Sequence, residues 1–184
     1  MIVRKIGIVV TVLTALVLTI SLAAAGNVHL KGGKNAKPSF TDNGLSLTAT
    51  GALSGLGNGD ILVKVVAAAD VTSTCTNPAG ATQPPGQNPA PITVSGSQAI
   101  PAGEIKNGTV NFNASTQAPS STIAGAPDCP NPQWTEAITD LAFTSATITI
   151  EQPPGTVVLT VSCSFSSPTS NGPVPGGNVS CTSS

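Results

Sequence analysis

The sequence predicts an all-β fold, a single antiparallel β-sandwich of about seven to nine strands with a broadly immunoglobulin-like architecture. Three observations indicate this fold. Apolar residues form short runs that alternate with polar residues at a period of two. Residues that favour tight turns separate these runs. No stretch after residue 25 has the apolar stripe of an amphipathic helix.

The predicted strands follow one another along the whole chain after residue 44. Residues 61–68 form a continuous run rich in Val, Ile and Leu, which suits a central strand, and residues 71–75 are expected to continue it after a bend. The other predicted strands alternate apolar and polar residues, and they are 45–49, 92–94, 110–114, 141–150, 157–165 and a short 179–182.

The segments between the strands contain specific turn residues. Residues 42–44 (Asp-Asn-Gly) and 58–60 (Asn-Gly-Asp) tolerate positive φ, as tight turns require. Residues 153–155 (Pro-Pro-Gly) predict a hairpin that pairs residues 148–150 with residues 157–159.

Two proline-rich segments, residues 77–91 and 117–132, are predicted to be long surface loops. Residues 135–140 are expected to form at most one helical turn. Trp134 does not fit the immunoglobulin pattern of a Trp between two cysteines, because it follows Cys129. We expect Trp134 to fill one end of the sandwich, with a surface-binding role as the alternative.

Residues 1–25 resemble a helical export signal of the Sec type. Arg4 and Lys5 precede an apolar run at residues 6–22, and three alanines precede Gly26. The sequence therefore predicts a secreted protein without a membrane segment after cleavage. An uncleaved anchor is the alternative, because the apolar run approaches the roughly 20 residues that span a bilayer.

Four cysteines in an exported chain predict two disulfides, for which three pairings are possible. We favour Cys75 with Cys129 and Cys163 with Cys181. The first two cysteines open similar segments, Cys-Thr-Asn-Pro and Cys-Pro-Asn-Pro, and the second pair would tie the last strand to the strand before it. The wide spacing of the cysteines argues against a zinc site, which uses close cysteine pairs.

Charge divides the exported chain into two parts. Five lysines and eight acidic residues after residue 25 give a formal net charge of −3. Residues 26–38, predicted to be a flexible tail, contain Lys31, Lys34 and Lys37, whereas residues 39–184 form the acidic sandwich domain. The tail is expected to aid solubility, or to contact another copy or an anionic envelope polymer. No Arg follows residue 25, which argues against nucleic acid as a partner.

The residues that enzymes need are not arranged for catalysis. His29, the single histidine, lies close to the expected mature N-terminus, and no Gly-x-Ser-x-Gly or phosphate-binding motif occurs. Glu136, Asp140 and Glu151 are expected to be solvated carboxylates rather than a glycosidase pair. Calcium is the alternative for the oxygen ligands at residues 42–43 and 58–60 and at Asp128, which lack the dense spacing of a dedicated site. The sequence thus predicts no enzyme, no cofactor and no metal.

Several motifs carry a family resemblance across most of the exported chain. They are Gly-Asn-Val-His-Leu-Lys-Gly-Gly at 26–33, Thr-Asp-Asn-Gly-Leu at 41–45, Leu-Gly-Asn-Gly-Asp at 56–60, and the two segments opened by Cys75 and Cys129. With these motifs the chain resembles small, uncharacterised secreted bacterial proteins, notably from actinobacteria. The resemblance implies export and one disulfide-bonded domain, and it supplies no activity and no site residues.

Two classes of function fit these expectations. The first is a non-enzymatic structural or surface-interaction protein of the cell envelope or extracellular matrix, which associates with itself through poorly guarded sheet edges. The second is a soluble extracellular module that binds a ligand, glycan or protein through its proline-rich and glycine-rich loops. The candidate interaction residues are Lys31, Lys34, Lys37 and Trp134.

Overall fold

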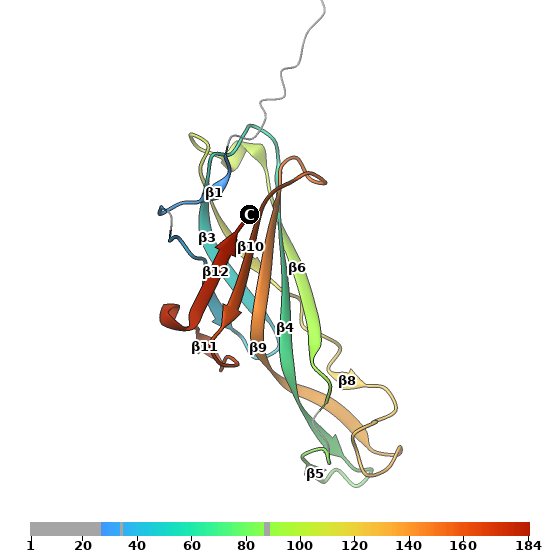
Figure 1. Cartoon of the computed structure of the whole chain (residues 1–184). Coiled ribbons are helices and arrows are strands. Elements are labelled where there is room, and N and C mark those ends of the chain that lie inside the picture. Colours follow the sequence, from blue (N-terminus) through green and yellow to red (C-terminus); the bar gives the residue numbers. More distant parts are fainter. Residues whose placement is uncertain (1–26, 34, 87–88) are drawn as a thin grey trace, which may run out of the picture.

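Two antiparallel β-sheets form the protein (Figure 1). The structure is a computed structural model that describes residues 27–33, 35–86 and 89–184. It confirms the predicted all-β fold with two disulfides, whereas the immunoglobulin-like connection of the strands stays a prediction. The export signal predicted at residues 1–25 lies outside the described residues. Among the described residues, no helix is long and apolar enough to cross a membrane.

The first sheet is built around β3 (Leu47–Ser54). This strand pairs with β7 (Val110–Ser115), with β1 (His29–Leu30) and with β2 (Ser39–Asp42), which in turn pairs with β11 (Gly172–Pro173). β1 belongs to the segment predicted as a flexible tail, yet Val28 and Leu30 are buried in the core. This part of the segment is therefore folded, because it buries two apolar side chains and pairs with β3.

The second sheet contains the longest strands. Its order is β12 (Val179–Ser183), β10 (Val157–Phe165), β9 (Thr135–Glu151), β4 (Ile61–Thr76) and β6 (Ile92–Ile100). Two short strands pair near the far ends of β4 and β9, namely β5 (Thr82–Gln83) with β4 and β8 (Thr122–Ile123) with β9. Two short 3₁₀ helices complete the described elements, η1 (Ala102–Glu104) and η2 (Gly176–Asn178).

The core lies between the two sheets and consists of aliphatic and phenylalanine side chains. Successive side chains of a strand point to opposite faces of the sheet, so one half of them faces the core. In β4, every second side chain is buried along all 16 residues of the strand. Burial of each large side chain contributes roughly 1.5–3 kcal/mol. The largest fully buried apolar side chains include Phe40, Leu47, Leu53, Ile61, Phe143 and Ile148.

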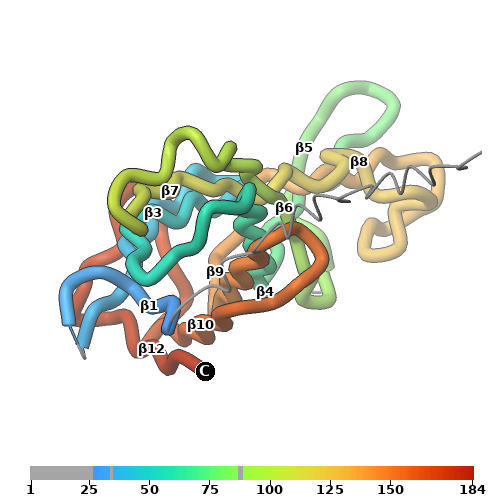
Figure 2. The backbone as a smooth tube through the Cα atoms, turned by 90° about the horizontal axis from the view of Figure 1, so that it is seen from above, coloured from blue at the N-terminus to red at the C-terminus, as the bar shows by residue number. Residues whose placement is uncertain are grey.

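β4 and β9 extend well past the sandwich as a long antiparallel ribbon. Beyond the last residues that pair with β6, the ribbon carries β5, β8 and the two proline-rich loops. We call the described residues within 71–91 and 117–139 the arm, which leaves out residues 87–88. Figures 1 and 2 show the arm projecting from the sandwich, and in Figure 1 β1 lies at the opposite end of the molecule.

Two β-bulges lie where the ribbon leaves the sandwich. The register between β4 and β9 shifts after Ala68 and again after Thr72, which leaves Thr144 and Thr139 of β9 without a paired residue. The hydroxyl of Thr144 donates to the Ala68 carbonyl at 3.3 Å, and that of Thr139 donates to the Thr72 carbonyl at 3.2 Å. Bulges increase local twist and bend a strand. The first bulge lies where the sequence predicts a bend before residues 71–75, and the second lies within these residues.

Every predicted strand coincides with or overlaps an observed strand, whereas the short strands β1, β2, β5, β8 and β11 lie outside the predicted strands. The hairpin at residues 153–155 is confirmed, with Ile150 opposite Leu159, and β10 spans the predicted residues 157–165. The helical turn predicted at residues 135–140 is wrong, because these residues form the start of β9. Their backbone groups pair with β4 on one side and with β8 on the other, and this pairing outweighs a weak local preference.

Candidate interaction site

The structure separates the residues that the sequence offers as interaction candidates. Lys31 and Lys37 lie on the sandwich, whereas Trp134 lies on the arm directly before β9. Lys34 lies outside the described residues. Lys31, Lys37 and Trp134 therefore do not form one site.

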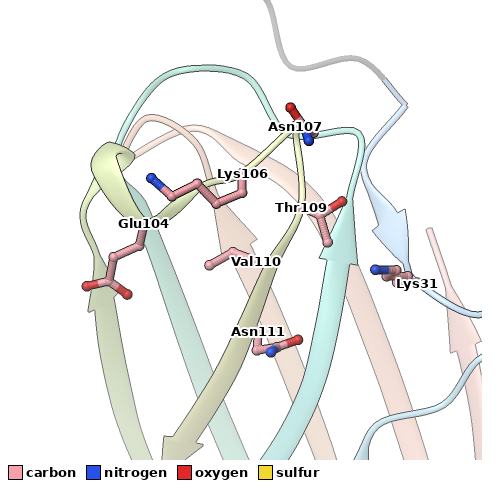
Figure 3. A pocket seen from close by; sticks show the side chains of 7 residues that line it. All are labelled: Lys31, Glu104, Lys106, Asn107, Thr109, Val110 and Asn111. Atoms are coloured by element: carbon pink, nitrogen blue, oxygen red, sulfur yellow. The ribbon is translucent and has the colours of Figure 1, made fainter.

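Lys31 lines an open cleft of about 600 Å³ at the end of the sandwich away from the arm. Figure 3 shows Lys31 on one side of this cleft, Glu104 on the other and Lys106 between them. Lys106 donates from Nζ to the Gly103 carbonyl at 2.9 Å. Two lysines and one carboxylate give the cleft a weak positive net charge, which ions in the solvent screen. The sequence alone did not indicate that Lys106 lies in this cleft.

Lys37 has a structural role at the edge of the second sheet. Its Nζ donates to the Val179 carbonyl at 2.6 Å and to the Gly176 carbonyl at 3.0 Å. It lines a groove of about 560 Å³ that residues 35–37 form with β12. Lys37 thus fastens the segment before β2 to the start of β12.

The arm is held together covalently. Cys75, at the end of β4, forms a disulfide with Cys129 in the loop that precedes β9, and Cys163 of β10 pairs with Cys181 of β12. Both favoured pairings are confirmed. The first bridge joins residues 54 positions apart and anchors residues 117–134 to the ribbon.

A buried carboxylate reinforces this anchor. Glu136 is fully buried, directly opposite Cys75 in the β4–β9 ladder. Its Oε1 accepts a hydrogen bond from the Ser73 hydroxyl at 2.8 Å, and its Oε2 accepts one from the backbone N–H of Asp128 at 3.2 Å. Because Asp128 adjoins Cys129, the carboxylate and the disulfide fix the same part of the loop. Glu136 is therefore not the solvated carboxylate that the sequence predicts.

The surface of the arm is almost free of charge. Residues 71–91 and 117–139 contain no Lys, Arg or His, and Asp128 and the buried Glu136 are their only carboxylates. Most described loop residues of the arm are exposed Pro, Ala, Gly, Thr, Ser, Gln and Asn side chains. Trp134 is half-buried among them and is not part of the apolar core, so it does not fill an end of the sandwich as predicted.

The remaining loop carboxylates serve local structure. Asp42 is buried and accepts hydrogen bonds from the Gly44 N–H and the Thr169 hydroxyl, and Asp60 accepts one from the Ala102 N–H. Asp140, on β9, has one buried oxygen with no hydrogen-bond partner within the described part of the chain. Among the described residues, no three His, Cys, Asp or Glu side chains converge in a way that could hold a metal ion.

One ion pair ties the β9–β10 hairpin to β4. Lys64 Nζ contacts Glu151 Oε1, and Glu151 Oε2 accepts a hydrogen bond from the Gly155 N–H at 2.7 Å. The hydrogen bond from Lys64, together with that from Gly155, lowers the pKa of Glu151 against the opposing effect of burial. Glu151 is thus a structural carboxylate at the hairpin.

Comparison with known proteins gives no relative. No protein-family model matches the chain, and neither a curated protein nor a solved structure is significantly similar to it. The geometry of the described residues is therefore the basis for a functional proposal.

Proposed function

We propose that this chain is an exported, non-enzymatic interaction protein of the cell envelope or extracellular matrix, and that the arm is its contact surface. The observation that carries the proposal is the combination of a braced scaffold with a nearly uncharged surface. Loops that a rigid sheet positions are where recognition usually resides in β-proteins. Two disulfides also fit a protein that works outside the reducing cytoplasm.

The composition of the arm favours an uncharged partner surface. An interface without lysines and with a single half-buried carboxylate gains little from salt-dependent attraction, so its binding depends on shape, hydrogen bonds and apolar contact. Trp134 and the surrounding prolines supply rigid apolar area, because these side chains lose little conformational entropy when they bind.

The alternative of a small-ligand module has less support. Four clefts among the described residues, of about 600, 560, 400 and 140 Å³, are lined mainly by the sandwich and its C-terminal edge, and none of these four is lined by Trp134. Small-ligand sites are usually concave and mostly enclosed. A projecting arm suits contact with a larger partner.

Binding to envelope fractions tests the proposal. The labelled protein without residues 1–25 is mixed with envelope fractions of the producing cells, and the retained protein is measured against salt concentration. We expect retention that changes little with salt, and at least a tenfold loss (about 1.4 kcal/mol) in a Thr82→Lys, Gln133→Lys variant, which places charge on exposed arm residues.

A matched control places the same two charges on the sandwich. Ser97 and Ser164 are exposed on β6 and β10, so Ser97→Lys, Ser164→Lys carries the same net charge away from the arm. This control is expected to bind like the unmodified protein. Equal retention of both variants, or no retention of the unmodified protein, would contradict the proposal.

A further inference from the structure

The outer edge of β12 differs from the other edges of the two sheets. At the opposite edge of the second sheet, β6 is covered by the chain around β7: the Gln117 N–H donates to the Ser95 carbonyl at 2.9 Å. The approach is so close there that a Cβ on Gly96 would lie 2.0 Å from the Ser115 carbonyl oxygen. β11, at the edge of the first sheet, has two residues, one of which is Pro173. Short length and proline are common guards of sheet edges.

β12 has five residues, with neither proline nor charge among them. Along β12 and the residues next to its two ends, the even-numbered residues make the backbone hydrogen bonds toward β10. Ser184 exchanges two such hydrogen bonds with Thr160, and the Asn178 carbonyl accepts one from the Ser166 N–H. In an antiparallel pair the intervening residues direct their N–H and C=O groups away from the partner strand. The backbone groups of Val179, Cys181 and Ser183 therefore point outward, into the groove that residues 35–37 border.

We propose that β12 pairs with β12 of a second copy of this chain, antiparallel and about a twofold axis at Cys181. This inference goes beyond the contact proposed for the arm, because β12 lies at one edge of the second sheet and β5, which belongs to the arm, lies at the other. In this register Cys181 faces its own symmetry mate, and Ser183 faces Val179 of the other copy. Each outward N–H of Cys181 and Ser183 then meets a carbonyl, and two seven-stranded sheets become one continuous sheet.

Charge favours this partner. β12 carries no charge, so no like charges meet at the twofold axis. Lys37 is bound at Val179, and the two Val179 residues of the paired strands would lie about 14 Å apart at roughly 3.4 Å per residue. This separation exceeds the Debye length of about 8 Å at physiological ionic strength, so the two lysines repel one another little. Lys37 Nζ uses one of the two lone pairs of the Val179 carbonyl, so this carbonyl can still accept the Ser183 N–H of the other copy. The second hydrogen bond of Lys37, to the Gly176 carbonyl, keeps the pairing from extending before Val179.

The size of the contact sets its strength. Two five-residue edge strands bury less than the roughly 1,200 Å² of a stable interface, so we expect a weak dimer with a Kd of about 0.1–1 mM. The Cys163–Cys181 disulfide holds β12 against β10, so the strand does not need to be ordered during pairing. Such an edge acts chiefly where copies are concentrated, as on a cell surface.

A proline substitution at Ser183 distinguishes dimers that form by pairing of two β12 strands from dimers that form by any other contact. Ser183→Pro removes the outward N–H of this residue and no hydrogen bond to β10, whereas the matched control Ser183→Ala shortens the same side chain and keeps the N–H. Sedimentation and amide hydrogen exchange are measured for the protein without residues 1–25 at about 10 µM and about 1 mM. In the unmodified protein and in Ser183→Ala, we expect dimers at the higher concentration and an at least twofold slower exchange of the Cys181 and Ser183 amides.

Ser183→Pro is expected to stay monomeric at both concentrations, with the Thr182 amide still protected as evidence that β12 remains paired to β10. If β12 detaches in this variant, Ser183→Lys replaces it, because two charges close to the new strand pair oppose dimerisation. A monomer of the unmodified protein at 1 mM, dimers that persist in the folded variant, or dimers without protection of the Cys181 amide would overturn the inference. None of these results affects binding by the arm, which the charged arm variant tests.

Discussion

The sandwich and the arm share two continuous strands, yet different forces hold them together. In the sandwich, β4 and β9 bury large side chains such as Ile61, Phe143 and Ile148 between two sheets. In the arm, Val71 and Ile138 still pack against the apolar core. The other buried residues of the arm include Ser73, Cys75 and Glu136, which contribute a hydrogen bond, a disulfide and a carboxylate. A strand can therefore leave a hydrophobic core and remain ordered if local covalent and polar links replace apolar burial.

Phe143→Ala should have the largest effect of the substitutions that separate the two regions. Phe143 is fully buried in the sandwich, and its truncation is expected to lower the free energy of unfolding by about 3–5 kcal/mol. Chemical denaturation measures this loss. The control Val157→Ala removes a side chain that is 56% exposed and should cost less than about 0.5 kcal/mol. Similar losses for both variants would mean that Phe143 is not part of the principal core.

Glu136→Gln should weaken the arm and spare the sandwich. The amide of this variant can turn its oxygen to the Asp128 N–H and its NH2 to the Ser73 hydroxyl, which then accepts, so both hydrogen bonds remain but lose the strength that a charged acceptor gives them in a buried site. We expect the amides around residues 128 and 136 to exchange faster, by about 1–3 kcal/mol of local opening free energy. Ser73→Ala, which removes one donor and leaves the carboxylate, should cost about 1 kcal/mol. An equal loss of protection in the sandwich would show that the two regions open together.

The smallest expected effect is the loss of stability of the sandwich in acid. Because the folded-state pKa of Glu151 is lowered, this carboxylate contributes stability that is present above its unfolded pKa of about 4.3 and is lost as the pH falls through the folded value. Glu151→Gln should therefore reduce the difference in melting temperature between pH 6 and pH 3. An unchanged difference would show that the contact with Lys64 contributes nothing measurable.

The sequence indicates the sandwich better than the arm. Period-two alternation and turn residues are local signals, and they predict β10 and the hairpin before it at the correct residues. Similar contexts around Cys75 and Cys129 also indicate their pairing. The length of β9 is not local, because residues 135–140 become a strand through pairing with β4 and β8.

The candidate sites also depend on contacts between residues that are distant in the sequence. Proline-rich composition predicts the two surface loops, but it does not reveal that they share one arm. Glu136 resembles any solvated carboxylate in the sequence, and its burial depends on a loop that a distant cysteine holds in place. The outward groups of β12 likewise follow from its register with β10. Two signals were available in the sequence: the Ser two residues before Cys75 with the Glu seven residues after Cys129, and the threonines at the two bulges.

Hydrogen exchange of a Cys75→Ala, Cys129→Ala variant tests most directly whether the arm is a locally braced unit. The disulfide contributes about 2–4 kcal/mol by the loop it closes, and its stabilisation should be confined to the arm. We predict that amides at residues 72–76 and 135–139 lose protection, while those at 61–67 and 145–150 exchange as in the unmodified protein. Equal loss of protection in both sets, or full protection of the arm without its disulfide, would contradict this account.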